Sequence, residues 1–312
     1  MSSFRRLAIV STAATIELIA IGGLVRATKS GLGCGTDWPS CSGKLLPALE
    51  SRALVIEYSH RVTASLVVLL LVGLAALAIA RRRDAPNLVW PSVAAVGLVL
   101  SQALLGLLVV KLELEAISVT LHLGAAMALL ALLVYIVIAA STVVGSPVAT
   151  DRGVSRAAGF AAISVLVLLL VGSFVTGRAA GLAFPDWPLM DGRVIPDLGA
   201  GPDAIHFAHR ALALVVGIIV FRLGLTVARR KAELPVQAKL AHAAMGLYSV
   251  EVALGAVNVW TELNAAAVSL HLLLGALIWG VLVGLAVSSH PGIARPATDR
   301  AAAPRAVLEP GR

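Results

Sequence analysis

The sequence contains little charge. Asp, Glu, Lys and Arg make up 13% of its 312 residues, whereas hydrophobic residues make up 59%. A soluble domain of this size has no core large enough to bury so much apolar surface. Apolar runs nearly free of charge match a bilayer instead, because about 20 helical residues cross its hydrocarbon layer of about 30 Å. The composition therefore excludes a soluble protein and predicts an all-α integral membrane protein embedded in a lipid bilayer.

Eight apolar runs of suitable length follow one another along the chain. They cover residues 7–26, 53–80, 89–110, 117–140, 157–178, 204–228, 237–260 and 266–288. We expect eight transmembrane helices, arranged as two pseudo-symmetric four-helix bundles. The N-terminal bundle would occupy residues 1–140 and the C-terminal bundle residues 157–288. A cytoplasmic linker over 141–156 would join them, and the Ala-, Pro- and Arg-rich tail over 289–312 is expected to be disordered and cytoplasmic.

The net charge of +8 is concentrated in short segments. These segments contain Arg5 and Arg6, Arg81 to Arg83, Arg152 with Arg156, and Arg229 to Lys231. Dense basic residues in short loops mark the cytoplasmic face of a membrane protein. The pattern therefore predicts a multi-pass protein of the plasma membrane with both termini in the cytoplasm, and it does not indicate a nucleic-acid partner.

The two halves of the chain repeat each other. The interval from His60 to His209 is 149 residues, and so is the interval from His122 to His271. Within each half the two histidines stand 62 residues apart. A duplicated unit that carries one histidine pair per copy predicts two related sites.

Two long loops, over 27–52 and 179–203, are expected on the outer side, and both contain Asp-Trp-Pro. Long loops in compact proteins are usually functional or disordered, and the repeated motif favours ordered lids. Cys34 and Cys41, the only cysteines, both lie in the first loop. An oxidising outer compartment favours a disulfide between them. A structural staple and a redox-active thiol pair both remain open.

Few other metal-binding side chains accompany the histidines. Each of the four lies near the outer entry of its helix, and costly ionisable groups within a membrane usually face a bundle interior. Zinc and copper sites take three or four ligands, often including thiolate or carboxylate, and each half has too few. Two facing histidines instead suit the axial positions of a haem iron. The structural alternative is four buried histidines that form hydrogen bonds between helices.

The two histidine pairs differ in their neighbours. Glu57 lies three residues before His60, on the same helix face, whereas His206 lies three residues before His209. A carboxylate beside a porphyrin can stabilise developing positive charge or accept a proton. The alternative for Glu57 is a helix-end position exposed to outer water, and for His206 an exposed position at the membrane surface.

Two further pairs of polar residues follow the repeat. Arg61 and Arg210 come directly after the histidines, where either pairs with a haem propionate or extends to the interface. Gln102 and Glu251 are again 149 residues apart. This second pair supports the repeat more than it supports any function.

Together these residues resemble the haem A synthase family. The matching segments are Gly-Leu-Val-Arg-Ala-Thr at 23–28, Gly-Leu-Gly-Cys-Gly with Asp-Trp-Pro and Cys at 31–41, Glu-Tyr-Ser-His-Arg at 57–61, Leu-His-Leu-Gly at 121–124, His-Phe-Ala-His-Arg at 206–210 and Leu-His-Leu-Leu-Leu-Gly at 270–275. The resemblance covers essentially the whole chain apart from the tail.

The resemblance implies an oxidoreductase that converts the C8 methyl group of haem O to the formyl group of haem A for terminal oxidases. It implies that the N-terminal half holds substrate haem O between His60 and His122, with Glu57 as the catalytic group. The C-terminal half would hold haem b, its iron bound by His209 and His271. His206, Arg61 and Arg210 would support these sites. The cysteine pair is typical of many bacterial members and is implicated in activity or haem handover.

The resemblance also implies partners in haem supply and oxidase assembly. A haem O synthase would deliver the substrate, and oxidase assembly factors and a homo-oligomer are further candidates. Three alternatives remain open at this point. They are a dihaem b-type cytochrome that transfers electrons between quinol and an outer acceptor, a transporter built from parallel repeats, and a thiol-oxidising membrane protein.

Overall fold

The computed structural model describes residues 2–142, 149–199 and 201–293. These residues form eight long α-helices and one short 3-10 helix, and no strand occurs among them. The helices are α1 (Ser2–Ala27), α2 (Arg52–Ala80), η1 (Pro86–Leu88), α3 (Val89–Lys111), α4 (Ala116–Thr142), α5 (Arg152–Gly177), α6 (Pro202–Ala228), α7 (Pro235–Trp260) and α8 (Ala265–Ser289). All eight α-helices are long and apolar enough to span a membrane, which confirms the predicted fold class.

Several helices extend beyond the apolar runs. Helix α5 begins at Arg152 and not near 157, because the Asp151 side chain accepts a hydrogen bond from the Val154 N–H and caps the helix. Helix α1 begins at Ser2, five residues before its apolar run. The stretch between α4 and α5 is therefore shorter than the expected linker over 141–156. Residues 143–148 of that linker and 294–312 of the expected tail lie outside the described residues.

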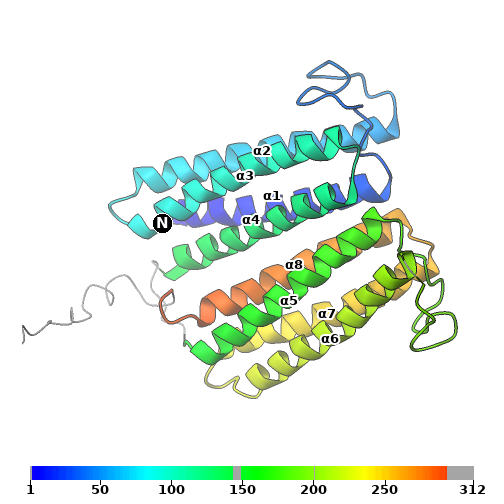
Figure 1. The fold of residues 1–312 in the computed structure, drawn as a ribbon. Coiled ribbons are helices and arrows are strands. Elements are labelled where there is room, and N and C mark those ends of the chain that lie inside the picture. Colours follow the sequence, from blue (N-terminus) through cyan, green and yellow to red (C-terminus); the bar gives the residue numbers. More distant parts are fainter. Residues whose placement is uncertain (1, 143–148, 200, 294–312) are drawn as a thin grey trace, which may run out of the picture.

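Each half closes into a four-helix bundle (Figure 1). In the first bundle, α2 packs against α1 and α3, and α4 packs against the same two helices. Helices α2 and α4 therefore stand diagonally opposite each other across the bundle interior. Helices α6 and α8 have the same relationship in the second bundle, where α5 and α7 are their neighbours. The four repeated histidines lie on these two diagonal pairs.

The bundles meet along α1 and α4 on one side and α5 and α8 on the other. Helix α1 packs against α8, α5 packs against α4, and α4 packs against α8. Exchanging the halves leaves this set of contacts unchanged, which defines a pseudo-twofold axis parallel to the helices. Trp279 of α8 donates a hydrogen bond from Nε1 to the Met127 carbonyl of α4 at 3.0 Å. The two halves are thus packed through their cores.

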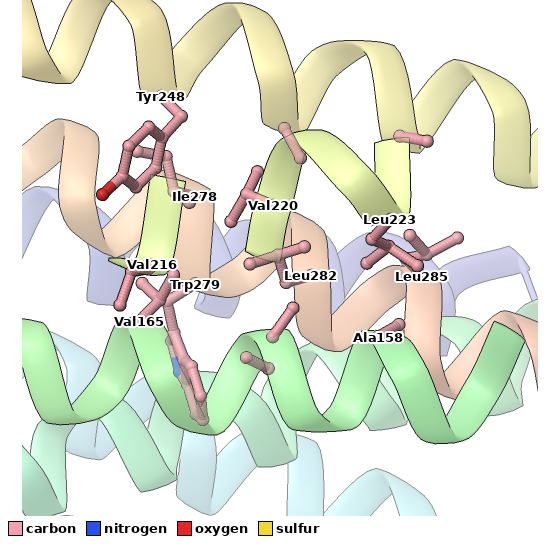
Figure 2. Packing of buried hydrophobic residues seen from close by; sticks show 14 of the residues in the cluster. Ala158, Val165, Val216, Val220, Leu223, Tyr248, Ile278, Trp279, Leu282 and Leu285 are labelled. Atoms are coloured by element: carbon pink, nitrogen blue, oxygen red, sulfur yellow. The ribbon is translucent and has the colours of Figure 1, made fainter. Parts of the chain in front are cut away.

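The larger apolar cluster fills the second bundle. Figure 2 shows Val165 of α5, Val216 and Val220 of α6, Tyr248 of α7, and Trp279 of α8 packed together, and all are almost completely buried. Lipid is as apolar as these side chains, so close van der Waals packing, and not exclusion of water, holds such helices together.

Both long loops lie at one end of the molecule, and the N-terminus lies at the other (Figure 1). The first long loop joins α1 to α2, and the second joins α5 to α6. The basic α2–α3 and α6–α7 turns lie at the opposite end, with the N-terminus. The repeats therefore run in the same direction, as an even number of helices per repeat requires.

Candidate functional site

The first long loop is closed by a disulfide between Cys34 and Cys41, whose Cα atoms are 4.6 Å apart. This bond confirms the predicted bridge, and both cysteine side chains are buried. They pack with Leu54 and Tyr58 at the start of α2. The loop is therefore an ordered structure that rests on the end of the bundle.

Glu57 joins this loop to α2. Its Oε2 atom accepts a hydrogen bond from the Cys34 N–H at 2.7 Å, and its Oε1 atom accepts one from the Arg61 guanidinium. The Glu57 side chain is buried, with 4% of the residue exposed. The alternative of a helix-end residue exposed to outer water is therefore wrong.

His206 occupies the equivalent position in the second half, and it is also 4% exposed. Its Nδ1 atom accepts a hydrogen bond from the Phe184 N–H at 3.2 Å, which corresponds to the contact between Glu57 and Cys34. The alternative of an exposed histidine is wrong as well. Arg210 Nε lies 3.1 Å from His206 Nε2. A neutral imidazole has one acceptor nitrogen, so it cannot accept from both groups at once, whereas a carboxylate can.

Arg61 and Arg210 bind the backbone of the loops. The carbonyls that accept from Arg61 are those of Asp37 and Ser40, and those that accept from Arg210 are those of Phe184, Asp186 and Leu189. Each arginine thus fixes the Asp-Trp-Pro segment of its own loop to the helix below. A contact with haem propionates stays a prediction.

The alignment of the two loops contains a shift of one residue. Phe184 stands where Cys34 stands, an interval of 150, whereas Met190 pairs with Arg193 as Cys41 pairs with Lys44, an interval of 149. The second loop is therefore one residue shorter between these points. Helices α1 and α5 consequently align at an interval of 150, which the histidine spacing does not reveal.

Asp186 organises the second loop. Its two carboxylate oxygens accept hydrogen bonds from the backbone N–H groups of Asp191 and Gly192, both at 2.9 Å. These bonds favour the charged carboxylate, with Gly192 as the main cause, and they lower the pKa of Asp186 below its ordinary value. The loop is therefore held by a charged side chain as well as by Arg210.

The four repeated histidines form two pairs. His60 and His122 lie on the diagonal helices α2 and α4. His209 and His271 lie on the diagonal helices α6 and α8. The Nδ1 atoms of all four rings are buried and make no hydrogen bond among the described residues, although that of His271 lies 3.3 Å from Glu251 Oε1. The structural alternative, a hydrogen bond from Nδ1 to a neighbouring helix, is therefore not formed by His60, His122 or His209, whereas His271 has the Glu251 carboxylate of α7 within reach.

Each of these imidazoles lies against a glycine of an adjacent helix. A Cβ atom at Gly22 would approach Cε1 of His60 to 3.3 Å, and one at Gly172 would approach Cε1 of His209 to 3.0 Å. The same distance is 3.6 Å from Gly106 to His122 and from Gly255 to His271. Side chains at the first two positions would press on the rings. Glycine therefore gives the histidines of both bundles their space.

This arrangement fits a haem in each bundle. Each bundle carries two histidines with buried Nδ1 atoms on diagonally opposite helices, and this pair would hold a haem through its iron. No group of three or more His, Cys, Asp and Glu side chains suited to a metal ion comes together in the described residues. A zinc or copper cluster with three or four protein ligands is therefore not formed in that part of the chain.

Comparisons with known proteins agree with a protein that binds haem. A family model described as cytochrome oxidase assembly protein matches residues 5–283. The curated haem A synthase of Symbiobacterium thermophilum is 30% identical over 93% of this chain and 97% of its own length. Those of Staphylococcus carnosus and Caulobacter vibrioides are 31% and 30% identical, over 91% and 90% of this chain and 94% and 92% of their own lengths. The family model and these relatives each match about nine-tenths of the chain or more, and the protein therefore belongs to the cytochrome oxidase assembly protein family.

Proposed function

We propose that this protein is a haem A synthase, a multi-pass plasma-membrane oxidoreductase that converts the C8 methyl group of haem O to the formyl group of haem A. Its relatives carry that name and match nearly the whole chain. One observation carries the proposal in the structure. Two bundles share the same histidine pairs, yet only the first places a buried carboxylate, Glu57, one helical turn before a histidine.

The N-terminal bundle, which we take as residues 1–140, is the proposed substrate site. His60 and His122 would hold haem O, and the buried carboxylate of Glu57 would serve the reaction at its C8 methyl group. A carboxylate at this depth can stabilise positive charge that develops at the oxidised carbon, or it can accept a proton. The disulfide-closed loop covers the same end of the bundle as Glu57 and would limit access of water.

The C-terminal bundle, residues 157–288, is the proposed cofactor site. His209 and His271 would hold haem b through its iron. When bound there, this group would supply one-electron transfer. His206 and Arg210 would hold the second loop over this site.

The membrane orientation follows from charge. Basic turns and the N-terminus share one end of the molecule, so we place that end and both termini in the cytoplasm. The two long loops would then face the outside, where a disulfide persists. A haem O synthase that hands over substrate, and oxidase assembly factors that receive product, are the partners we propose.

A dihaem cytochrome that serves quinol oxidation is the main rival. It predicts two permanent haems and no need for Glu57. A transporter with parallel repeats predicts no bound haem, and a thiol-oxidising protein leaves the four histidines without a role. The relatives are named haem A synthases, and their names support none of these three alternatives.

The test is production of haem A in cells. The protein would be expressed with a haem O synthase in a host that makes no haem A, and the extracted haems would be separated by chromatography. Haem A is the expected product, and a host without the protein should contain haem O but no haem A. A normal dihaem spectrum without any haem A would favour the cytochrome instead.

A further inference from the structure

The surroundings of the two histidine pairs also differ on the helices α3 and α7. Gln102 of α3 and Glu251 of α7 occupy equivalent positions in the two bundles. Gln102 donates from Nε2 to the backbone carbonyl of His122 at 3.1 Å. Glu251 instead places Oε1 3.3 Å from the ring Nδ1 of His271. The amide therefore contacts the backbone of its histidine, whereas the carboxylate faces the imidazole.

Glu251 lies inside the membrane-spanning part of α7, and its side chain is 13% exposed. A carboxylate at such a position is costly unless a partner compensates it. Within the described residues, His271 is the only ion-pair partner of Glu251, and Oε2 is buried without a hydrogen bond. The carboxylate is therefore committed to this histidine and to no arginine or lysine.

The packing around Glu251 leaves room for its carboxylate. A Cβ atom at Gly275, one turn after His271 on α8, would lie 3.2 Å from Glu251 Oε1 and 2.6 Å from Leu169 Cδ2. The equivalent residue of the first bundle is Ala126. The bundle that has the carboxylate thus has glycine where the other bundle has a methyl group.

We propose that Glu251 is a positioning residue for the haem of the C-terminal bundle. Its carboxylate accepts the Nδ1 proton of His271, which fixes the tautomer that leaves Nε2 free to bind iron. A carboxylate in this role makes the imidazole a stronger electron donor, so it stabilises ferric over ferrous iron and lowers the reduction potential. This inference rests on the proposed haem site, and it assigns different electronic properties to two sites with the same ligands.

The experiment is a spectroelectrochemical titration of the purified full-length protein with its haem bound. Glu251→Gln keeps the size of the side chain, removes its charge, and installs the residue that the first bundle has. We expect the midpoint potential of the C-terminal haem to rise, with at least a tenfold change in the equilibrium constant for reduction, which is about 59 mV for one electron. The low-spin electron paramagnetic resonance g values should move in the direction of weaker imidazole donation.

Two variants control for a purely structural effect. Glu251→Asp keeps a carboxylate and should retain a potential nearer to that of the wild type. Gln102→Leu changes the equivalent residue of the other bundle and should leave the potential of the C-terminal haem unchanged. An unchanged midpoint in Glu251→Gln, or an equal shift in the Gln and Asp variants, would overturn the proposal. If Glu251→Gln loses its haem, retention by Glu251→Asp at the wild-type potential supports it, and loss from both contradicts it.

A failure of the haem site itself would look different. In that case the wild-type protein would contain no haem, or His271→Leu would retain the wild-type spectrum. Either result would remove the proposed site before any potential was compared.

Discussion

The carboxylate of Glu57 accepts a hydrogen bond from the backbone N–H of Cys34 at 2.7 Å, so the residue proposed for catalysis also anchors the disulfide loop. His206 makes the same contact with Phe184 in the second bundle. Anchoring a loop therefore does not require a carboxylate at this position. What distinguishes Glu57 from His206 is its negative charge, and that charge is the property on which the proposed chemistry depends.

The disulfide should stabilise the first loop. Replacing both cysteines with serine should lower the free energy of unfolding by about 2–4 kcal/mol, because the unfolded chain regains the freedom that the bridge removes. Thermal unfolding in detergent would measure the loss. Peptide mapping without reductant should show the linked Cys34 and Cys41 peptides in the wild type, and two free thiols in fresh membranes would contradict the bridge.

Removing a ligand should remove the low-spin haem. His209→Leu and His271→Leu each leave one axial position without imidazole, so the bis-histidine absorption spectrum should disappear. His242→Leu is a matched control, since His242 lies on α7 and, among the described residues, bonds only to the Ala238 carbonyl of its own helix. A normal haem b spectrum in either ligand variant would refute the assignment.

The glycine beside His209 should be needed for haem binding. Gly172→Ala brings a methyl group to 3.0 Å from Cε1 of that ring, and overpacking of this kind costs about 1–3 kcal/mol. We expect lower haem occupancy and a shifted spectrum. Gly246→Ala on α7 meets no atom within 4 Å and should bind haem like the wild type. Equal occupancy in the two variants would show that the space beside His209 is irrelevant.

The second loop should loosen in acid. Its backbone hydrogen bonds lower the pKa of Asp186, so the folded protein binds a proton there less readily than the unfolded chain does. The stabilisation is therefore present above about pH 4, the ordinary range of an aspartate, and is lost as the pH falls through the lowered pKa. Limited proteolysis across pH 2–6 with a protease active in acid would measure this loss, and cleavage of the loop should become faster as the pH falls. Asp186→Asn should remove this pH-dependent increase in cleavage. The same dependence of cleavage on pH in the variant and the wild type would contradict a role for the Asp186 carboxylate.

Much of the fold follows from periodicity and charge alone. Runs of 20 or more apolar residues determine the eight helices, and the repeated histidines predict which helices face each other. The apolar runs do not predict the helix starts at Ser2 and Arg152, because polar residues extend both helices past these runs, and the Asp151 side chain caps the second of them. The local Ser/Thr/Asp cap signal was present at Asp151.

The details of the site were less accessible from the sequence. The burial of Glu57 and His206 depends on a loop that folds back over the helix end, and no periodicity describes such a loop. The glycines beside His60 and His209 fall at an interval of 150, so the spacing of 149 conceals their equivalence. The sequence spacing identifies Glu251 only as a marker of the repeat, because its contact with His271 joins two helices.

We propose that the two bundles have different roles, in which the first would oxidise haem O with Glu57 and the second would hold haem b. Haem extraction and chromatography from cells that express Glu57→Gln with a haem O synthase test it most directly. Glutamine keeps an oxygen that can accept from the Cys34 N–H, so the loop should stay anchored while the charge is lost. The account predicts an intact haem b spectrum together with accumulation of haem O, or of the alcohol intermediate, at the expense of haem A. Wild-type amounts of haem A in this strain would contradict it.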